Sequence, residues 1–195
     1  MNLKSGKIRN MSSITNRRKL ASEGPDFYPT PAWGTRALLH YEKFDGTIVE
    51  PCCGNGSMSE VLKTTNPVIS TDLHDRDYGK IKDVFTYTDQ IDNVVTNPPF
   101  LIAGDIILHM LPLFKNKMAM FLRTAFLESV SRYNTIYSVH PPARVYVFSK
   151  RITLYPAGQQ GVLTSGTTSY AWFIWERENN KKTELCWIAP SIGQD

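Results

Sequence analysis

The sequence predicts an α/β protein whose sheet is mostly parallel and is covered by helices on both faces. Along residues 30–138, short apolar runs alternate with segments whose apolar residues have helical spacing. Such alternation is typical of strand, helix, strand units with parallel strands. The C-terminal part differs, because its β-rich runs follow one another without a helix between them. Strands connected in this way pair antiparallel, so we expect the sheet to finish with a reversed edge.

The first helix is expected to begin at Pro31 and to end near Lys43. Thr30 is a suitable N-cap residue, and proline is favoured at the first helical position. Four residues have the spacing of one buried helix face: Trp33, Ala37, Leu38 and Tyr41.

The remaining elements are predicted from apolar runs and from the breakers that separate them. A turn at Asp45-Gly46 leads into a short buried strand, which ends at Pro51 and a glycine-containing loop. The expected strands are residues 47–50, 67–72, 91–96, 117–123, 144–149, 169–176 and 183–188, and the expected helices after the first are residues 57–63, 103–114 and 127–138.

The composition is that of one ordinary soluble globular domain. The chain has 195 residues, of which 42% are hydrophobic and 21% charged. No apolar run reaches the length of a membrane span, and the basic N-terminus lacks the apolar core of a signal peptide. The three cysteines, Cys52, Cys53 and Cys186, form no disulfide framework, and with four scattered histidines they predict no metal site.

The positive charge of the chain is concentrated at its start. The formal net charge is +4, and residues 1–24 contain one acid, Glu23, beside six cationic residues: Lys4, Lys7, Arg9, Arg17, Arg18 and Lys19. The segment is expected to be a flexible basic arm. It is either a solvated tail or an arm that contacts phosphates, and in the second case its contribution to binding would fall steeply with salt.

Two features at predicted strand ends indicate a nucleoside-containing cofactor. The stretch Glu50-Pro51-Cys52-Cys53-Gly54-Asn55-Gly56 lies where a strand passes to a helix, and its glycines allow the backbone to approach a ligand closely. An acid at the end of the next strand, Asp72, is placed to accept hydrogen bonds from ribose hydroxyls. Spacing alone leaves Asp75 and Asp77 as alternatives.

The strand at residues 91–96 runs directly into Asn97-Pro98-Pro99-Phe100. Two prolines remove two backbone donors and fix two φ angles, so the strand ends there in a stiff loop. The residue before a proline is held extended, which applies to Asn97. A stiff loop that presents one amide and one aromatic ring suits the binding of a flat group.

Taken in order, these stretches resemble the amino-methylating DNA methyltransferases, in particular small phage-type adenine-N6 enzymes that use S-adenosylmethionine. The matching stretches are Phe27-Tyr28-Pro29-Thr30-Pro31, EPCCGNG from Glu50, Asp72, Asp83 and NPPF from Asn97, with FLRTAFLES from Phe121 and YAWFIW from Tyr170. The resemblance covers roughly residues 26–177. It implies a Rossmann-like class I methyltransferase fold with a mostly parallel seven-stranded sheet, a reversed strand near the C-terminus and helices on both faces.

The resemblance also implies a set of cofactor-binding residues. Phe27, Tyr28 and Thr30 resemble the segment that closes over the methionine part. Glu50, Pro51, Cys52, Gly54 and Gly56 correspond to the glycine loop. Asp72 corresponds to the acid that accepts hydrogen bonds from the ribose. Asp83 and Val84 correspond to the residues that contact the adenine, and Asn97 is also expected to contact the cofactor. Asp89 and Asp92 also precede the NPPF loop and remain alternatives to Asp83.

In this family the catalytic loop corresponds to Asn97, Pro98, Pro99 and Phe100. An adenine N6 amine is a poor nucleophile, and the base must leave the duplex stack before an enzyme group can reach it. The Asn97 side-chain oxygen and the Pro98 carbonyl would each accept an N6 hydrogen, without a covalent intermediate. Phe100 would stack on the flipped base. Tyr155 would clamp its other face, with Phe148 as the alternative, and Arg151 would contact phosphate.

Other functions fit parts of the pattern. Pro51-Cys52 resembles the nucleophile of cytosine-C5 methyltransferases, but we reject that role because the pair lies in the cofactor loop without activating neighbours. NPPF-like loops also serve enzymes that methylate RNA bases or protein glutamine amides. A relative that binds DNA without turnover is the remaining alternative.

The resemblance leads to further expectations about organisation and partners. Residues 25–195 are expected to form one catalytic domain without a separate target-recognition domain. DNA, double- or single-stranded, is the expected partner, read by short loops such as residues 156–168, by a partner chain, or with relaxed specificity. The expected location is the cytoplasm of a bacterium or of a phage-infected host cell.

Overall fold

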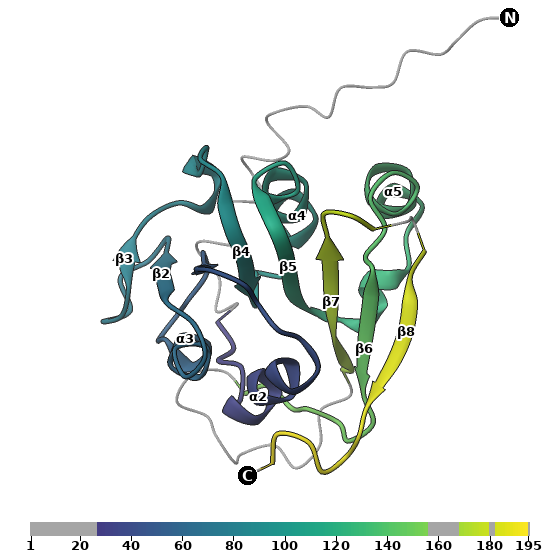
Figure 1. Cartoon of the computed structure of the whole chain (residues 1–195), viewed down its shortest axis with the longest axis horizontal. Coiled ribbons are helices and arrows are strands. Elements are labelled where there is room, and N and C mark those ends of the chain that lie inside the picture. The colour runs from purple at the N-terminus through teal and green to yellow at the C-terminus, as the bar shows by residue number, and fades with distance from the viewer. Residues whose placement is uncertain (1–26, 156–167, 180–181, 195) are drawn as a thin grey trace, which may run out of the picture.

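The computed structural model describes residues 27–155, 168–179 and 182–194 (Figure 1). The basic arm and most of the loop at residues 156–168 lie outside these ranges. Among the described residues, eight strands form one sheet in the order β3-β2-β1-β4-β5-β7-β6-β8. The strands are β1 (Ile48–Glu50), β2 (Val68–Asp72), β3 (Lys80–Ile81), β4 (Ile91–Thr96), β5 (Phe114–Arg123), β6 (Arg144–Phe148), β7 (Tyr170–Glu176) and β8 (Glu184–Ile188).

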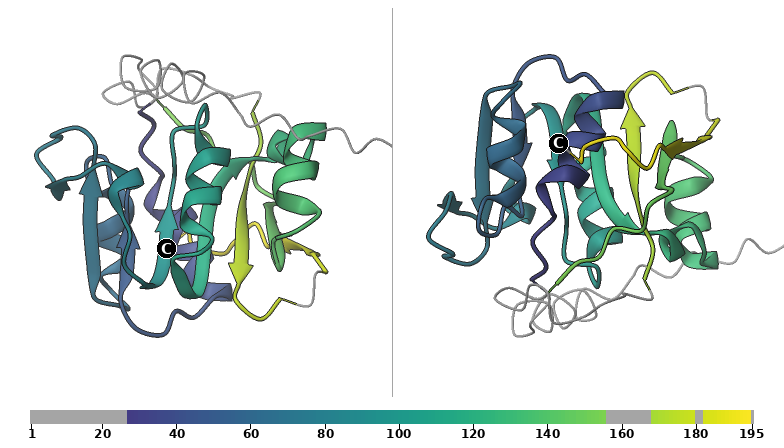
Figure 2. Two further views of the ribbon diagram at one scale, coloured as in Figure 1. Left: turned by 90° about the horizontal axis from the view of Figure 1, so that it is seen from above. Right: turned by 90° about the horizontal axis from the view of Figure 1, so that it is seen from below.

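The predicted α/β architecture is confirmed. The α-helices are α2 (Ala32–Tyr41), α3 (Ser57–Leu62), α4 (Ala103–Met110) and α5 (Val130–Arg132), with 3₁₀ turns η1 (Val84–Thr86) and η2 (Thr124–Leu127) and a π-helical turn η3 (Tyr133–Tyr137). One apolar cluster packs α2 and α3 against the sheet, and a second packs α4 and η3 against the opposite face. Helices therefore cover both faces, as Figure 2 shows.

Two expectations about the sheet are wrong in detail. The sheet has eight strands instead of seven, because the short β3 pairs with β2 from within a polar stretch that has no strand pattern. The reversed strand is β7, and it lies inside the sheet between β5 and β6. Both edges of β7 are therefore occupied, so β8 pairs with β6 instead, in parallel, and the sheet does not finish with a reversed edge.

Helix boundaries differ from the sequence prediction where tertiary contacts decide them. Helix α2 begins at Ala32 with Pro31 as its N-cap, because the Thr30 hydroxyl accepts a hydrogen bond from Asn97 and does not cap the helix. Tyr41, expected in the core, is 37% exposed. Helix α4 ends at Met110, since Phe114 already pairs with β4. The helix expected at residues 127–138 is replaced by η2, α5 and η3.

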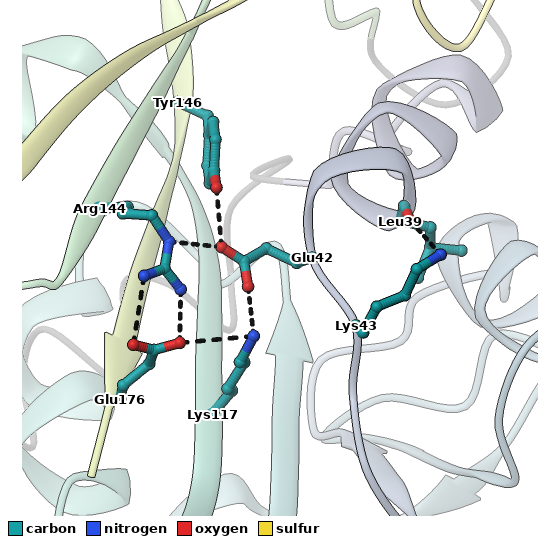
Figure 3. A network of polar contacts seen from close by, with 7 residues as sticks. All are labelled: Leu39, Glu42, Lys43, Lys117, Arg144, Tyr146 and Glu176. Carbon is teal, nitrogen blue, oxygen red and sulfur yellow. Dashed lines mark hydrogen bonds and ion pairs between the residues drawn. The ribbon is translucent and has the colours of Figure 1, made fainter. Parts of the chain in front are cut away.

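A buried ionic network lies at the amino edge of the parallel strands (Figure 3). Glu42, which is 2% exposed, accepts hydrogen bonds from Lys117 Nζ at 2.5 Å, Arg144 Nε at 2.6 Å and Tyr146 Oη at 2.9 Å. Glu176 completes the network through Arg144 Nη2 at 2.5 Å and Lys117 Nζ at 3.4 Å. These contacts join α2 to β5, β6 and β7, so they hold four elements together at the edge opposite the predicted site.

Candidate functional site

An open cleft lies at the carboxyl ends of β1, β2 and β4. This is the point where the strand order reverses between β1 and β4, which is the usual ligand position in open α/β sheets. Its empty volume is about 1040 Å³, part of it continuous with solvent. Every predicted residue of the catalytic loop lines it, and so do these predicted cofactor residues: Phe27, Tyr28, Thr30, Glu50, Pro51, Cys52, Asp72, Asp83 and Val84.

The glycine loop contains two glycines with a left-handed backbone, and neither is among the residues that line the cleft. Gly54 has φ +53° and Gly56 has φ +80°, a region in which side chains with a Cβ are strained. A Cβ at Gly54 would lie 2.2 Å from the Phe27 ring, and one at Gly56 would lie 2.4 Å from the Tyr78 ring. These two glycines therefore let the 27–30 segment and the Tyr78 loop pack closely around the cleft.

Asp72 connects the glycine loop to the end of β2. Its Oδ2 accepts a hydrogen bond from Gly54 N at 2.9 Å, and its Oδ1 accepts one from His74 N at 2.9 Å. Backbone donors thus fix the orientation of the carboxylate at the cleft. The alternatives are placed elsewhere, because Asp75 accepts a hydrogen bond from Asp77 N and neither residue is among those that line the cleft.

The structure also separates the three candidates for the adenine-binding acid. Asp83 lines the cleft and caps η1, where its Oδ1 accepts a hydrogen bond from Phe85 N at 2.9 Å. The next residue, Val84, is buried beside it. Asp92 instead pairs with Lys115 at 2.8 Å, outside the cleft-lining set, and Asp89 is likewise outside that set.

The side-chain amide of Asn97 is held in one orientation. Its Nδ2 donates to the Tyr28 carbonyl at 3.0 Å and to the Thr30 hydroxyl at 3.0 Å. A backbone carbonyl can only accept, so the end of the amide that faces it must be the NH₂ group. Both amide hydrogens are used, and Oδ1 is therefore the end left to accept a hydrogen bond from a ligand.

Phe100 lies at the rim of the cleft with a cation over its ring. The Arg123 guanidinium carbon is 4.6 Å from the Phe100 ring centroid, and Tyr170 lies beside the ring at 5.7 Å. The predicted substrate residues Tyr155 and Arg151 are not among the cleft-lining residues, and their roles stay predictions. Phe148 is buried against Trp33, which leaves it unsuited to clamp a base.

Burial keeps the acidic groups of the glycine loop neutral at moderate pH. Glu50 is 1% exposed, its carboxylate accepts a hydrogen bond from Ser59 Oγ, and burial raises its pKa to about 8. Burial raises the pKa of the Cys52 thiol far above its usual range and that of Cys53 to about 12. Both thiols stay protonated, which agrees with the rejection of Cys52 as a nucleophile.

Several contacts at and behind the cleft were not found from the sequence. Ser59 and Ser70 lie 2.5 Å apart (Oγ to Oγ) behind Glu50, and Arg76 lies over the Phe27 ring at 4.1 Å. Their positions depend on packing between β2 and α3, for which no local pattern exists.

In the described ranges no cluster of His, Cys, Asp and Glu side chains is arranged for a metal ion, and no described helix is long and apolar enough to cross a bilayer.

Comparison with known proteins gives matches of structure only. No protein-family model matches the sequence, and no curated protein matches it either. The type I restriction-modification methyltransferase subunit of Streptococcus thermophilus matches with a TM-score of 0.60 and 12% identity over 94% of this chain. The match covers 53% of that subunit, so the chain spans about half of its length.

Two further solved structures have the same fold. A protein of Pyrococcus horikoshii provisionally named an RNA methyltransferase gives a TM-score of 0.58 and 17% identity, over 83% of this chain and 98% of that one. A provisionally named class I S-adenosylmethionine-dependent methyltransferase of Listeria monocytogenes gives a TM-score of 0.50 and 11% identity. The match covers 93% of this chain and 66% of that one.

The chain has a class I methyltransferase fold. This confirms the fold class expected from the sequence, apart from the number of strands. It also agrees with S-adenosylmethionine as the expected cofactor, since that methyl donor is part of the name of the Listeria protein.

Proposed function

We propose that this protein transfers a methyl group from S-adenosylmethionine to the N6 amine of adenine in DNA. The observation that carries the proposal is the fixed amide of Asn97. Its Nδ2 is held by Tyr28 and Thr30, so Oδ1 is presented as a hydrogen-bond acceptor beside two prolines and an aromatic ring. An exocyclic amine on a flat ring has the donors and the shape that this arrangement fits.

The cleft fits the cofactor on its own geometry. Asp72 offers an oriented carboxylate to a ribose diol, beside the loop whose Gly54 and Gly56 allow Phe27 and Tyr78 to pack closely. Asp83 and Val84 would contact the adenine ring, and Tyr28 and Thr30 would contact the methionine part. When bound, S-adenosylmethionine would supply an electrophilic methyl group on a sulfonium.

The residues of the chain would act by positioning and hydrogen bonding. Asn97 Oδ1 and the Pro98 carbonyl each accept a hydrogen of the N6 amine, which draws the nitrogen toward tetrahedral geometry and directs its lone pair. Because the Asn97 amide is already fixed, little reorganisation is needed when the substrate enters. Cys52 is given no covalent role, because it lies in the cofactor loop without activating neighbours.

The substrate class is the finer part of the proposal. The similarity to a restriction-modification methyltransferase subunit supports DNA, together with a partner chain that would contribute to target recognition. The similarity to a protein named an RNA methyltransferase favours an RNA base as the second candidate. Short or relaxed sequence specificity follows if the isolated chain reads DNA through short loops.

The test is methyl transfer from labelled S-adenosylmethionine to unmethylated genomic DNA and to total RNA, with modified nucleosides identified by mass spectrometry. We expect N6-methyladenine in DNA from the wild type. Asn97→Ala should lose at least 100-fold in turnover, as expected for removal of one oriented hydrogen-bonding group, roughly 10²–10³-fold. Asn116→Ala, which removes an exposed amide that donates to the Asp45 carbonyl and does not line the cleft, is the matched control and should keep full activity.

The outcomes separate the candidates. Methylated bases in RNA alone would replace DNA by RNA as the substrate. Cofactor binding without methylation of either polymer would overturn the proposed reaction and leave a protein amide or a non-catalytic role. Equal turnover by Asn97→Ala and the wild type would remove Asn97 from catalysis.

A further inference from the structure

A second pocket opens behind the catalytic loop and shares Phe100 with the cleft. Its empty volume is about 580 Å³, against about 1040 Å³ for the cleft. Its walls come from the start of α4, from η2 and from the irregular α5 and η3 turns. It is lined by Phe100, Leu101, Gly104, Asp105, Leu108, Phe126, Ser129, Ser131, Arg132, Thr135 and Ile136.

The lining combines flat apolar surfaces with polar groups. Phe126 and Ile136 are buried core residues that reach the pocket, and Ser129, Ser131 and Thr135 add three hydroxyl groups. The Arg132 guanidinium carbon lies over the Phe126 ring at 4.6 Å, and Arg123, which is not a lining residue, has its guanidinium carbon over the Phe100 ring at 4.6 Å. Neither arginine forms a salt bridge within the described ranges.

The position of Arg132 is fixed by backbone contacts. Its Nε donates to the Phe126 carbonyl at 2.8 Å and its Nη2 to the Ala125 carbonyl at 3.1 Å. The guanidinium carbon is thus held over the Phe126 ring, and the Asp105 carboxylate lines the same pocket. Aromatic rings and guanidinium planes are the groups on which proteins stack unpaired bases.

The pocket is not filled by packing, as Gly104 shows. This residue lies in the first turn of α4, where a glycine costs roughly 0.5–1 kcal/mol relative to alanine. A Cβ built on it has no heavy atom within 4 Å, so neither close packing nor a positive φ explains the glycine. The opposite wall is the π-helical turn η3, and such turns occur frequently at functional sites.

We propose that this second pocket binds the nucleotide next to the acceptor base in a polynucleotide. The inference rests on the proposed function, because it takes the acceptor base to lie on the cleft side of Phe100. A neighbouring base would stack in the pocket and meet its hydroxyls, while Arg123 and Arg132 would face the phosphates between the two nucleotides. The pocket therefore favours a polymeric nucleic acid over a protein amide, and gives the chain a means of preferring one flanking base.

Gly104 allows the pocket to be filled without disturbing the core. Gly104→Leu places a side chain in the open space, and Gly104→Ala is the matched control with the same gain in helix propensity and little added volume. Binding of fluorescently labelled single-stranded oligonucleotides is measured by anisotropy and methyl transfer by label incorporation. Two oligonucleotides are compared, one intact and one with abasic sites on both sides of a single adenine.

On the intact oligonucleotide, Gly104→Leu should bind and react roughly 5- to 150-fold more weakly than Gly104→Ala, the loss expected for one stacked base. On the abasic oligonucleotide the two variants should be equal, since the contact is already absent. Both variants should keep wild-type affinity for S-adenosylmethionine and a melting temperature at least as high as the wild type.

Each result decides between the pocket and the reaction. Equal binding and transfer by the two variants on the intact oligonucleotide would overturn the pocket alone. An equally large loss on the abasic oligonucleotide would also overturn it, because the filled space would then belong to the acceptor. If Gly104→Leu weakens binding but the wild type transfers no methyl group, the proposal of nucleotide binding in the pocket stands and the proposed methyl transfer is overturned. No binding and no transfer would overturn both.

Discussion

Two buried glutamates at opposite edges of the sheet are stabilised in different ways. Glu42, at the amino edge, is surrounded by Lys117, Arg144 and Tyr146 within 2.9 Å. Glu50, at the carboxyl edge, has Ser59 as its hydrogen-bond donor and the carboxylate of Asp72 as its charged neighbour. Cations therefore balance the first carboxyl group, whereas burial and the nearby acid keep the second one protonated.

The contrast separates an edge at which charged side chains pair with one another from an edge at which polar groups are oriented beside the cleft. The amino edge pairs its charges with one another, and Arg144 and Glu176 reinforce each other: the pKa of Arg144 is raised and that of Glu176 lowered, each mainly by their mutual hydrogen bonds. At the carboxyl edge, backbone groups orient Asp72 and Asn97 beside an open cleft. Asp72 also forms a longer ion pair with Arg76, whose Nε lies 3.9 Å from Asp72 Oδ1, so this edge is oriented mainly by backbone contacts.

The largest effect should come from breaking the amino edge. Glu42→Ala would leave Lys117 and Arg144 partly buried without this partner, and removal of one member of a buried ion pair costs about 3–5 kcal/mol of folding free energy. Denaturant unfolding measures the loss, with the exposed Glu178→Ala as control. Cofactor affinity of the folded variant should stay unchanged; a loss of affinity equal to that of a cleft variant would show that the two edges are not independent.

A change at Glu50 should alter the pH dependence of stability. With a usual value of 4.5 and a folded pKa of about 8, Glu50 binds a proton on folding between these limits. Its contribution to stability is fully present below about pH 4.5 and is lost as pH rises through about 8. Glu50→Gln imitates the protonated form, so the free energy of unfolding of the wild type should fall relative to the variant across this window, by an amount on the order of a few kcal/mol.

Chemical denaturation of both proteins at several pH values between 5 and 9 measures this difference, and titrations of all other groups cancel in it. A difference that does not change with pH would mean that Glu50 is ionised in the folded protein. The two glutamates would then differ in partners but not in charge.

A smaller effect is expected at Asp72. Hydrogen bonds to charged groups contribute about 1.5–3 kcal/mol, so Asp72→Asn should weaken S-adenosylmethionine binding roughly 10- to 150-fold. In the wild type the two Asp72 carboxylate oxygens accept hydrogen bonds from the Gly54 and His74 N–H groups. The asparagine in the variant would replace one of these acceptors by an NH₂ group, which cannot accept. Calorimetric titration measures the affinity, and Asp75→Asn is the control. Equal losses in the two variants would remove Asp72 as the specific ribose acceptor.

The cleft was predictable from the sequence because its residues follow strand ends. Glu50, Asp72 and Asn97 each come at or directly after the last residue of a predicted strand, and parallel strands bring these ends together. Such a site can be predicted from the ends of the strands and their parallel direction, without knowing the contacts between distant residues.

The parts that were not predicted depend on contacts between distant segments. The Glu42 network joins residues 75 and 102 positions apart, and no pattern along the chain marks such partners. Helix α4 stops early because Phe114 pairs with Ile91 in the sheet. The second pocket is enclosed by η2, α5 and η3, whose irregular turns replace the regular helix expected from amphipathic spacing.

The smallest effect on stability is expected at Arg123, at the rim of the carboxyl edge. An exposed cation–π contact contributes about 0.5–1 kcal/mol, so Arg123→Gln should barely change the free energy of unfolding. Its effect on nucleic-acid binding should be larger than on folding. If the Arg123 guanidinium contacts a phosphate in the complex, the slope of log affinity against log salt should be about one unit shallower for Arg123→Gln than for the wild type.

Arg123→Lys separates this role from a packing role, because it keeps the charge and loses the planar group that lies over the Phe100 ring. The salt slope should then stay near that of the wild type, whereas Arg123→Gln lowers it. A slope unchanged in both variants, together with a loss of stability in both, would make Arg123 a support for Phe100. The carboxyl edge would then contain a contact made for folding, like those of the amino edge.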